Sequence, residues 1–168
     1  MSNVRKMVGG IAAVVVALLL FCGGWLTGRL GIGSVVALES LSDAERAFAD
    51  RMRNVALVGS FTVAGREARS PSSDRYEIAS VEKVGDDLWK FNAKMDCCGM
   101  AGSGAVPIVV PMRWVGDTPM IMMTDTSLPG IGTFTVRLFF YGDQYAGTWQ
   151  HGTVGGLMSG RIEPMSAK

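Results

Sequence analysis

Two neighbouring stretches decide the fold: residues 132–141, GTFTVRLFFY, and residues 144–151, QYAGTWQH. In both, apolar and polar side chains alternate, which is typical of antiparallel strands that bury one face. The joint between them is Gly142-Asp143. Glycine supplies a positive φ and aspartate tolerates one, so this joint suits a tight turn. The pattern therefore predicts a β-hairpin.

The same alternation recurs along most of the chain. We expect further strands at residues 55–64, 75–84, 88–95, 105–115, 118–125 and 154–162. Short joints such as Gly116-Asp117 and His151-Gly152 separate several of them, so consecutive strands should pair with their neighbours. About eight such strands predict a mainly β fold, an antiparallel up-and-down meander that closes into a barrel. A two-layer sandwich is the alternative.

Two prolines predict a seam in this barrel. Pro107 and Pro111 lie four residues apart on one expected strand, and both lack the backbone N–H. Amides an even number of residues apart point to the same side, so both missing donors face one neighbouring strand. Because the glycine-rich residues 96–104 precede this strand, we expect the seam between residues 88–95 and 105–115. A full backbone ladder there would contradict this hypothesis.

A short helix precedes the strands. Ser42 and Glu45 have the spacing of a capping box, in which each side chain satisfies the other residue's backbone N–H. Apolar residues then recur at helical spacing at Ala44, Phe48, Met52 and Val55. This predicts a helix over about residues 42–54. Residues 38–54 are therefore assigned as linker and helix, and residues 55–164 as the barrel domain.

Residues 7–26, MVGGIAAVVVALLLFCGGWL, form a 20-residue stretch without a charge. A helix of this length, at about 1.5 Å per residue, spans a hydrocarbon core of about 30 Å. Arg5 and Lys6 precede it, which predicts an amino terminus inside and a carboxy-terminal domain outside the cytoplasmic (inner) membrane. Residues 1–37 are thus expected to be a single-pass signal anchor with its linker. The alternative is a signal peptide cleaved near Ala37, followed by secretion.

Composition excludes several classes of protein. The chain has 168 residues, of which 48% are hydrophobic and 18% charged, and this excludes intrinsic disorder over most of its length. The net charge is +1, and no basic run extends beyond Arg5-Lys6. We therefore expect no nucleic-acid partner.

Chemistry-bearing motifs are sparse, and we assign no catalytic residue and no cofactor. His151 is the single histidine, and no cysteine or acid stands at ligand spacing beside it. Asp86 and Asp87 are explained as turn residues, although hydrolysis stays open as an alternative. A soft ion such as Cu(I) is a further alternative, with Cys97, Cys98 and Met100 as its ligands.

The sequence resembles two groups of proteins. A short helix followed by Gly59-Ser60-Phe61 is similar to the opening of calycin barrels, the lipocalins and fatty-acid-binding proteins, whose Gly-x-Trp strand follows a short helix. In this resemblance Arg161 takes the place of the arginine on the last lipocalin strand, and Phe61 replaces the tryptophan. The gap between two strands of fatty-acid-binding barrels would suit the seam at Pro107 and Pro111. Residues 130–163 resemble exported bacterial proteins of unknown function, which implies export and no particular activity.

These observations favour a non-catalytic barrel that binds an apolar small molecule. The alternatives are a protein-interaction or structural module of the cell envelope and, with less support in the motifs, an enzyme. The candidate cavity-facing residues are the large apolar side chains at inward positions, Phe61, Trp89, Phe91, Met112, Trp114, Phe134 and Trp149. Since an eight-stranded barrel is just wide enough for side chains to fill it, these residues are equally compatible with a solid core.

Overall fold

The computed structural model describes residues 15–23, 25, 35–65, 72–95, 106–128 and 132–165. The chain forms two compact units, Met1–Val35 and Val36–Lys168. In the first, residues 15–23 are helical. Among the described residues, none of the helices has the length and apolar character needed to cross a membrane. Much of the stretch 7–26 lies outside the described residues, so the anchor stays a prediction.

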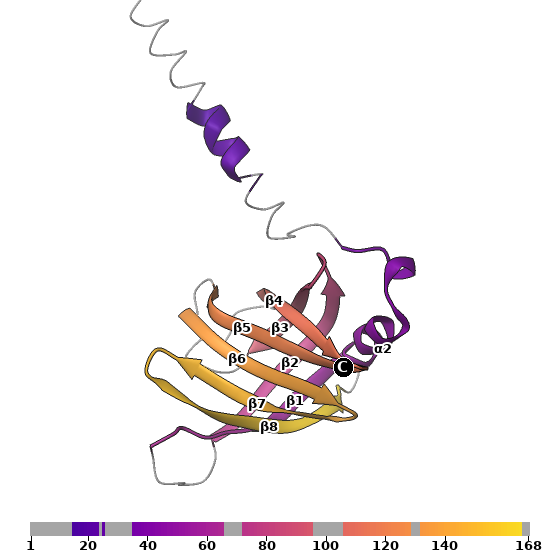
Figure 1. The fold of residues 1–168 in the computed structure, drawn as a ribbon, viewed down its shortest axis with the longest axis vertical. Helices are drawn as coiled ribbons and strands as arrows, with labels where there is room; N and C mark the ends of the chain where they lie inside the picture. The colour runs from indigo at the N-terminus through magenta and orange to yellow at the C-terminus, as the bar shows by residue number, and fades with distance from the viewer. Residues whose placement is uncertain are drawn as a thin grey trace, which may run out of the picture. The chain divides into compact units, whose positions relative to one another are not determined.

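The second unit is a closed antiparallel barrel whose eight strands follow one another in sequence order (Figure 1). The first and last strands pair with each other, which closes the barrel and excludes the sandwich. The prediction of an eight-stranded meander is confirmed. The strands are β1 (Val55–Phe61), β2 (Ser72–Lys83), β3 (Leu88–Met95), β4 (Val106–Val115), β5 (Thr118–Leu128), β6 (Gly132–Tyr141), β7 (Gln144–His151) and β8 (Val154–Pro164).

The predicted helix is present as α2 (Asp43–Arg51), after a single 3-10 turn at Leu38–Ser40. The capping box is confirmed, because the Ser42 hydroxyl accepts from the Glu45 amide at 3.3 Å and the Glu45 carboxylate accepts from the Ser42 amide at 2.9 Å. The helix is shorter than expected. Its chain turns at Asn54, which has a φ of 52° and donates its amide to the Ala79 carbonyl, leading directly into β1.

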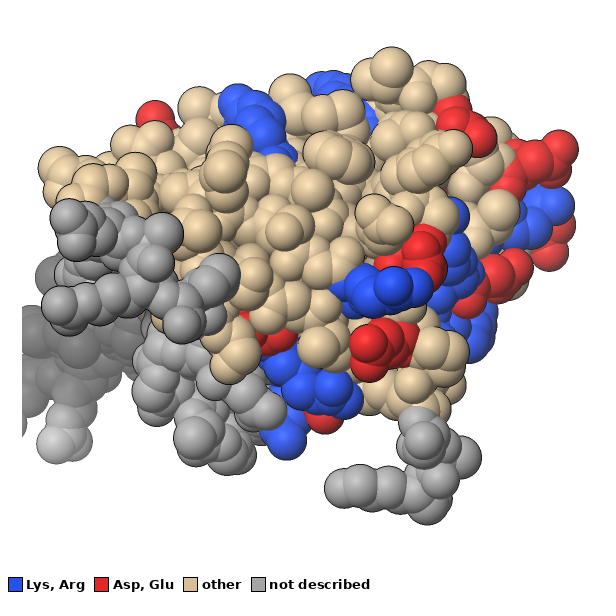
Figure 2. All heavy atoms as spheres, turned by 90° about the horizontal axis from the view of Figure 1, so that it is seen from below, with Lys and Arg blue, Asp and Glu red and all other residues tan. Residues whose placement is uncertain are grey.

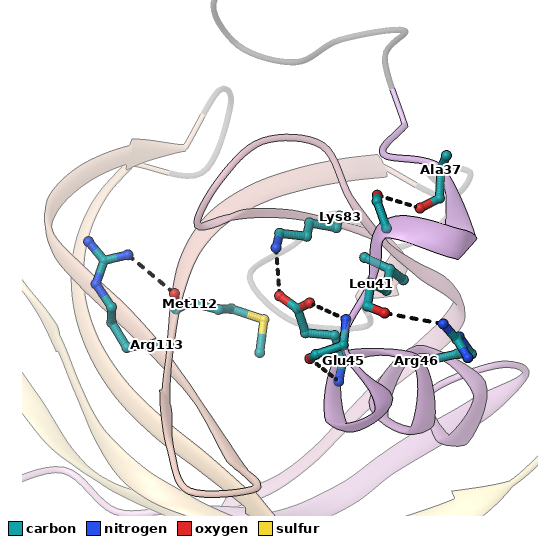
Figure 3. A network of polar contacts seen from close by, with 9 residues as sticks. Ala37, Leu41, Glu45, Arg46, Lys83, Met112 and Arg113 are labelled. Atoms are coloured by element: carbon teal, nitrogen blue, oxygen red, sulfur yellow. Dashed lines mark hydrogen bonds and ion pairs between the residues drawn. The ribbon is translucent and has the colours of Figure 1, made fainter.

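One ion pair joins α2 to the barrel. The Lys83 ammonium at the end of β2 lies 2.6 Å from the Glu45 carboxylate, and both side chains are largely buried (Figure 3). Burial raises the pKa of Glu45, but hydrogen bonds from Lys83 and Ser42 outweigh it and the net pKa is lowered. This pair therefore stabilises the fold at pH values above the ordinary glutamate range and loses its effect as the pH falls.

The helix α2 fills one end of the barrel. Its Phe48 ring lies 5.8 Å from Trp89, 5.9 Å from Trp114 and 5.4 Å from Phe140, measured between ring centroids. Phe48, Trp89 and Phe140 are each at most 1% exposed. Edge-on and tilted aromatic packing of this kind is favourable beyond the area it buries. The interior at the α2 end is therefore a packed core.

The weakly paired side of β4 is the opposite one from the side that the sequence predicts. β3 and β4 pair continuously from Leu88↔Pro111 to Ala93↔Val106, so the seam predicted there is wrong. The pairing of β4 with β5 is short instead, running only from Met112↔Ile121 to Val115↔Thr118.

The direction of the Met112 amide explains this difference. It donates to the carbonyl of Asp87, the residue directly before β3. Pro107 and Pro111 are odd numbers of residues away from Met112, so their ring nitrogens face β5. The prolines do share one neighbour, but that neighbour is β5.

Glycines occupy four inward positions of β1, β7 and β8. An added Cβ would lie 2.2 Å from the Ser159 carbonyl oxygen at Gly59 and 1.8 Å from that of Arg137 at Gly147. At Gly156 and Gly160 the corresponding distances, to the carbonyl oxygens of Thr62 and Val58, are 1.9 and 2.3 Å. The backbones approach too closely for any side chain, as at the sharp bends of barrel corners.

Candidate ligand site in the barrel interior

We call the half of the barrel interior that lies away from α2 the far half. Several of its inward-facing apolar side chains are only partly buried, in contrast to the fully buried Trp89 and Phe140 at the α2 end. These partly buried side chains are Phe61, Tyr76, Ile108, Leu128, Phe134, Val136, Trp149 and Met158. The far half therefore offers apolar surface that the described residues do not fully bury.

Two aromatic pairs stand in the far half. The ring of Phe61 packs edge-on against Trp149, with centroids 5.7 Å apart. Phe134 stacks on His151 at 4.6 Å. His151 also lies close to Gly132, where an added Cβ would be 2.8 Å from its Nε2 atom. The single histidine thus acts as a packing residue at the strand ends.

Three buried polar atoms lie among these apolar groups without a hydrogen-bond partner among the described residues: Asp74 Oδ2, the Tyr145 hydroxyl and Trp149 Nε1. Asp74 is 6% exposed and Tyr145 is 1% exposed. A buried polar group without a partner costs on the order of 1–3 kcal/mol, so such groups call for an explanation.

Asp74 and Tyr145 come together around glycines. Asp74 on β2 pairs with Gly59 on β1, which in turn pairs with Gly160 on β8. An added Cβ at Gly59 would lie 2.5 Å from the Tyr145 hydroxyl, and one at Gly160 would lie 2.7 Å from it. The two glycines therefore leave the space that the tyrosine hydroxyl occupies next to the aspartate.

Electrostatics links the same two groups. Burial raises the pKa of Asp74, and hydrogen bonds from the Tyr76 side chain and the Arg75 backbone offset this only in part. Burial and the neighbouring charge of Asp74 raise the pKa of Tyr145 to about 12. Above pH 10 the unfolded chain loses the tyrosine proton more readily than the folded one, so this contribution to stability is lost between pH 10 and about 12.

The raised pKa of Asp74 predicts an unusual pH dependence. The folded protein holds this proton more tightly than the unfolded chain, so the stabilisation is complete below the ordinary aspartate pKa and is lost as the pH rises through the folded-state value. We expect Asp74→Asn to be more stable than the wild type at pH 7 by on the order of 1 kcal/mol, with the difference shrinking towards pH 4. Urea unfolding across this range measures it. The exposed turn variant Asp86→Asn should follow the wild type, and parallel curves for all three proteins would contradict the prediction.

The structure divides the predicted cavity residues between two places. Phe61, Phe134 and Trp149 lie in the far half with the polar atoms. The others belong to the packed core or lie against it: Trp89, Phe91, Met112 and Trp114. Asp74 and the Tyr145 hydroxyl were missed as site groups. An acid opposite a strand glycine was the available signal, but Asp74 falls just before the expected start of its strand.

The alternative chemistries find no support among the described residues. Cys97, Cys98 and Met100 lie outside them, and within them no group of three or more histidine, cysteine or acidic side chains is arranged to hold a metal ion. Of the turn acids, Asp87 is paired with Arg113 on the outer surface.

Comparison with known proteins found no matching family model, no matching curated protein and no matching solved structure. The class of this protein is therefore defined by its own fold, as a closed eight-stranded antiparallel barrel with a helix packed into one end.

Proposed function

We propose that this protein binds an apolar small molecule in the far half of its barrel. The observation that carries the proposal is the set of half-buried, inward-facing aromatic side chains around buried polar atoms that have no hydrogen-bond partner among the described residues. Small-molecule sites have this composition, a mostly apolar lining with a few polar groups that fix orientation.

The energetics favour an apolar ligand. Each Å² of apolar surface that a ligand removes from water contributes about 25 cal/mol. Phe61, Phe134 and Trp149 present such surface, while the α2 end is already filled by Phe48 and its aromatic neighbours. We expect the ligand to enter away from α2, where the pairing of β4 with β5 stops.

The test uses two phenylalanines on one strand. Phe134 and Phe139 both lie on β6, with Phe134 facing inward and Phe139 outward and 41% exposed. We expect the full chain to bind a neutral, environment-sensitive apolar dye saturably, with Phe134→Ala weakening the affinity about tenfold, or about 1.4 kcal/mol. Phe139→Ala should leave the affinity unchanged. A fluorescence titration without saturation, or equal losses in both variants, would refute the proposal.

A protein-interaction module is the second candidate. Figure 2 shows a face on which charged side chains gather towards one side and a broad area carries none. Several apolar side chains on the outside of the barrel and its turns are well exposed: Val115, Phe139, Tyr141, Val154 and Leu157. If the dye fails to bind, the protein-interaction function becomes the better supported of the two candidates. Attachment to the membrane through residues 7–26 remains a proposal from the sequence in either case.

A further inference from the structure

We propose that Asp74, together with the Tyr145 hydroxyl, is the polar anchor of the interior and selects apolar ligands that carry a basic nitrogen. This inference rests on the proposed function, because it specifies the chemistry of the molecule that the far half binds. It concerns two residues that no sequence motif marked as a site.

Asp74 is the only formally charged side chain that the described residues place inside the far half. None of the ion pairs among the described residues involves it. The charged side chains of neighbouring positions are engaged elsewhere: Arg75 pairs with Glu77 at 3.4 Å, and Arg161 pairs with Asp143.

The described groups that face Asp74 include no cation. Its own strand contributes Tyr76, and β7 contributes Tyr145. At the corresponding positions β1 carries Gly59 and β8 carries Gly160, which have no side chains. Lys94 of β3 is exposed and pairs in register with Glu77, which is an odd number of residues from Asp74 on β2 and so lies on the outer face. Among the described residues, then, none supplies a counter-charge for Asp74, and we infer that a ligand supplies it.

A protonated amine fits this arrangement. It donates hydrogen bonds to Asp74 Oδ2 and to the Tyr145 oxygen, and so satisfies both orphaned atoms while it neutralises the buried carboxylate. An alcohol of the same chain length forms hydrogen bonds without neutralising the charge. A carboxylate ligand brings a like charge next to Asp74. The expected order of affinity is amine, then alcohol, then carboxylate.

The experiment measures displacement of the neutral dye from the full chain by decylamine, decanol and decanoate, each below its aggregation concentration. We expect decylamine to bind at least about tenfold more tightly than decanol, and decanoate to bind most weakly. In Asp74→Asn the amine should lose its advantage, so that decylamine and decanol displace the dye with similar affinity. The matched turn variant Asp86→Asn should keep the wild-type order.

Two further readouts separate recognition from a structural effect. The advantage of decylamine over decanol should grow as the pH rises and Asp74 ionises, and this trend should vanish in Asp74→Asn. Tyr145→Phe keeps the ring and removes only the hydroxyl, so it should reduce the amine preference severalfold with the fold retained.

The outcomes distinguish the two proposals. If decanol and decanoate displace the dye in a Phe134-dependent way but decylamine has no Asp74-dependent advantage, the amine inference is wrong and the proposed function stands. If none of the three binds, the proposed function fails and the inference falls with it.

Discussion

Replacing Phe48 with alanine is expected to lower the free energy of unfolding by about 3–5 kcal/mol, the range for truncating a fully buried phenylalanine. Phe48 is 1% exposed and its ring contacts the rings of Trp89, Trp114 and Phe140. The truncation leaves a void that rigid strand backbones on every side cannot close. It also removes the aromatic contacts between α2 and the barrel core.

Urea unfolding followed by tryptophan fluorescence measures this effect, because Trp89 and Trp114 flank the altered side chain. Phe139→Ala is the control, since that side chain is 41% exposed on the outer face, and it should cost less than about 1 kcal/mol. Equal losses in the two variants would show that α2 does not complete the core. Dye binding gives a second comparison: the far half lies away from α2, so Phe48→Ala should weaken binding far less than Phe134→Ala does.

Much of the barrel follows from local signals. Strict alternation in β3, β6 and β7 and glycine turns between strands determine which segments pair, because a hairpin partner is fixed by its neighbour in sequence. Closure is different. The pairing of β1 with β8 joins the two ends of the domain and depends on the accumulated bend of all the strands, which no short window contains.

The seam is a second feature that a short stretch of sequence does not determine, here at the level of single backbone amides. The spacing of Pro107 and Pro111 correctly requires both ring nitrogens to face one neighbour. Which neighbour this is depends on whether the amides of the inward-facing residues of β4 point towards β3 or towards β5. Only the register of β4 with β3, in which the Met112 amide donates to the Asp87 carbonyl, determines this. Sequence spacing therefore predicted that both prolines face the same neighbouring strand, but not which strand that is.

The candidate site was predicted only in its apolar part. Phe61, Phe134 and Trp149 stand out because large side chains on the apolar face of a strand point inward. Asp74 does not, since a single acid next to a serine-rich segment is more typical of a loop. Its meaning comes from Gly59, its partner on the neighbouring strand β1, and from Tyr145 of β7, which comes close only after the barrel has closed.

Gly147→Ala is expected to destabilise the fold by about 3 kcal/mol, although it adds a single methyl group. Its Cβ would lie 1.8 Å from the Arg137 carbonyl oxygen and 2.8 Å from the carbonyl carbon, both backbone atoms of the neighbouring strand. A flexible side chain would move aside, but here β6 and β7 must separate, and the ladder between them runs the full length of β7. The strand bend that brings them together is part of how the barrel closes.

Gly85→Ala provides the matched control for this substitution. Gly85 has an ordinary φ, and an added Cβ would meet only the Leu88 side chain, at 3.5 Å or more, so the free energy of unfolding should change by less than about 1 kcal/mol. Thermal or urea unfolding of the two variants tests the contrast. If Gly147→Ala unfolds like Gly85→Ala, the strands have room at this corner, and the tight bends of β7 and β8 are not what fixes the width of the barrel. The space beside the Tyr145 hydroxyl would then be adjustable as well, and the ligand selectivity assigned to Asp74 would have to arise in a less rigid site.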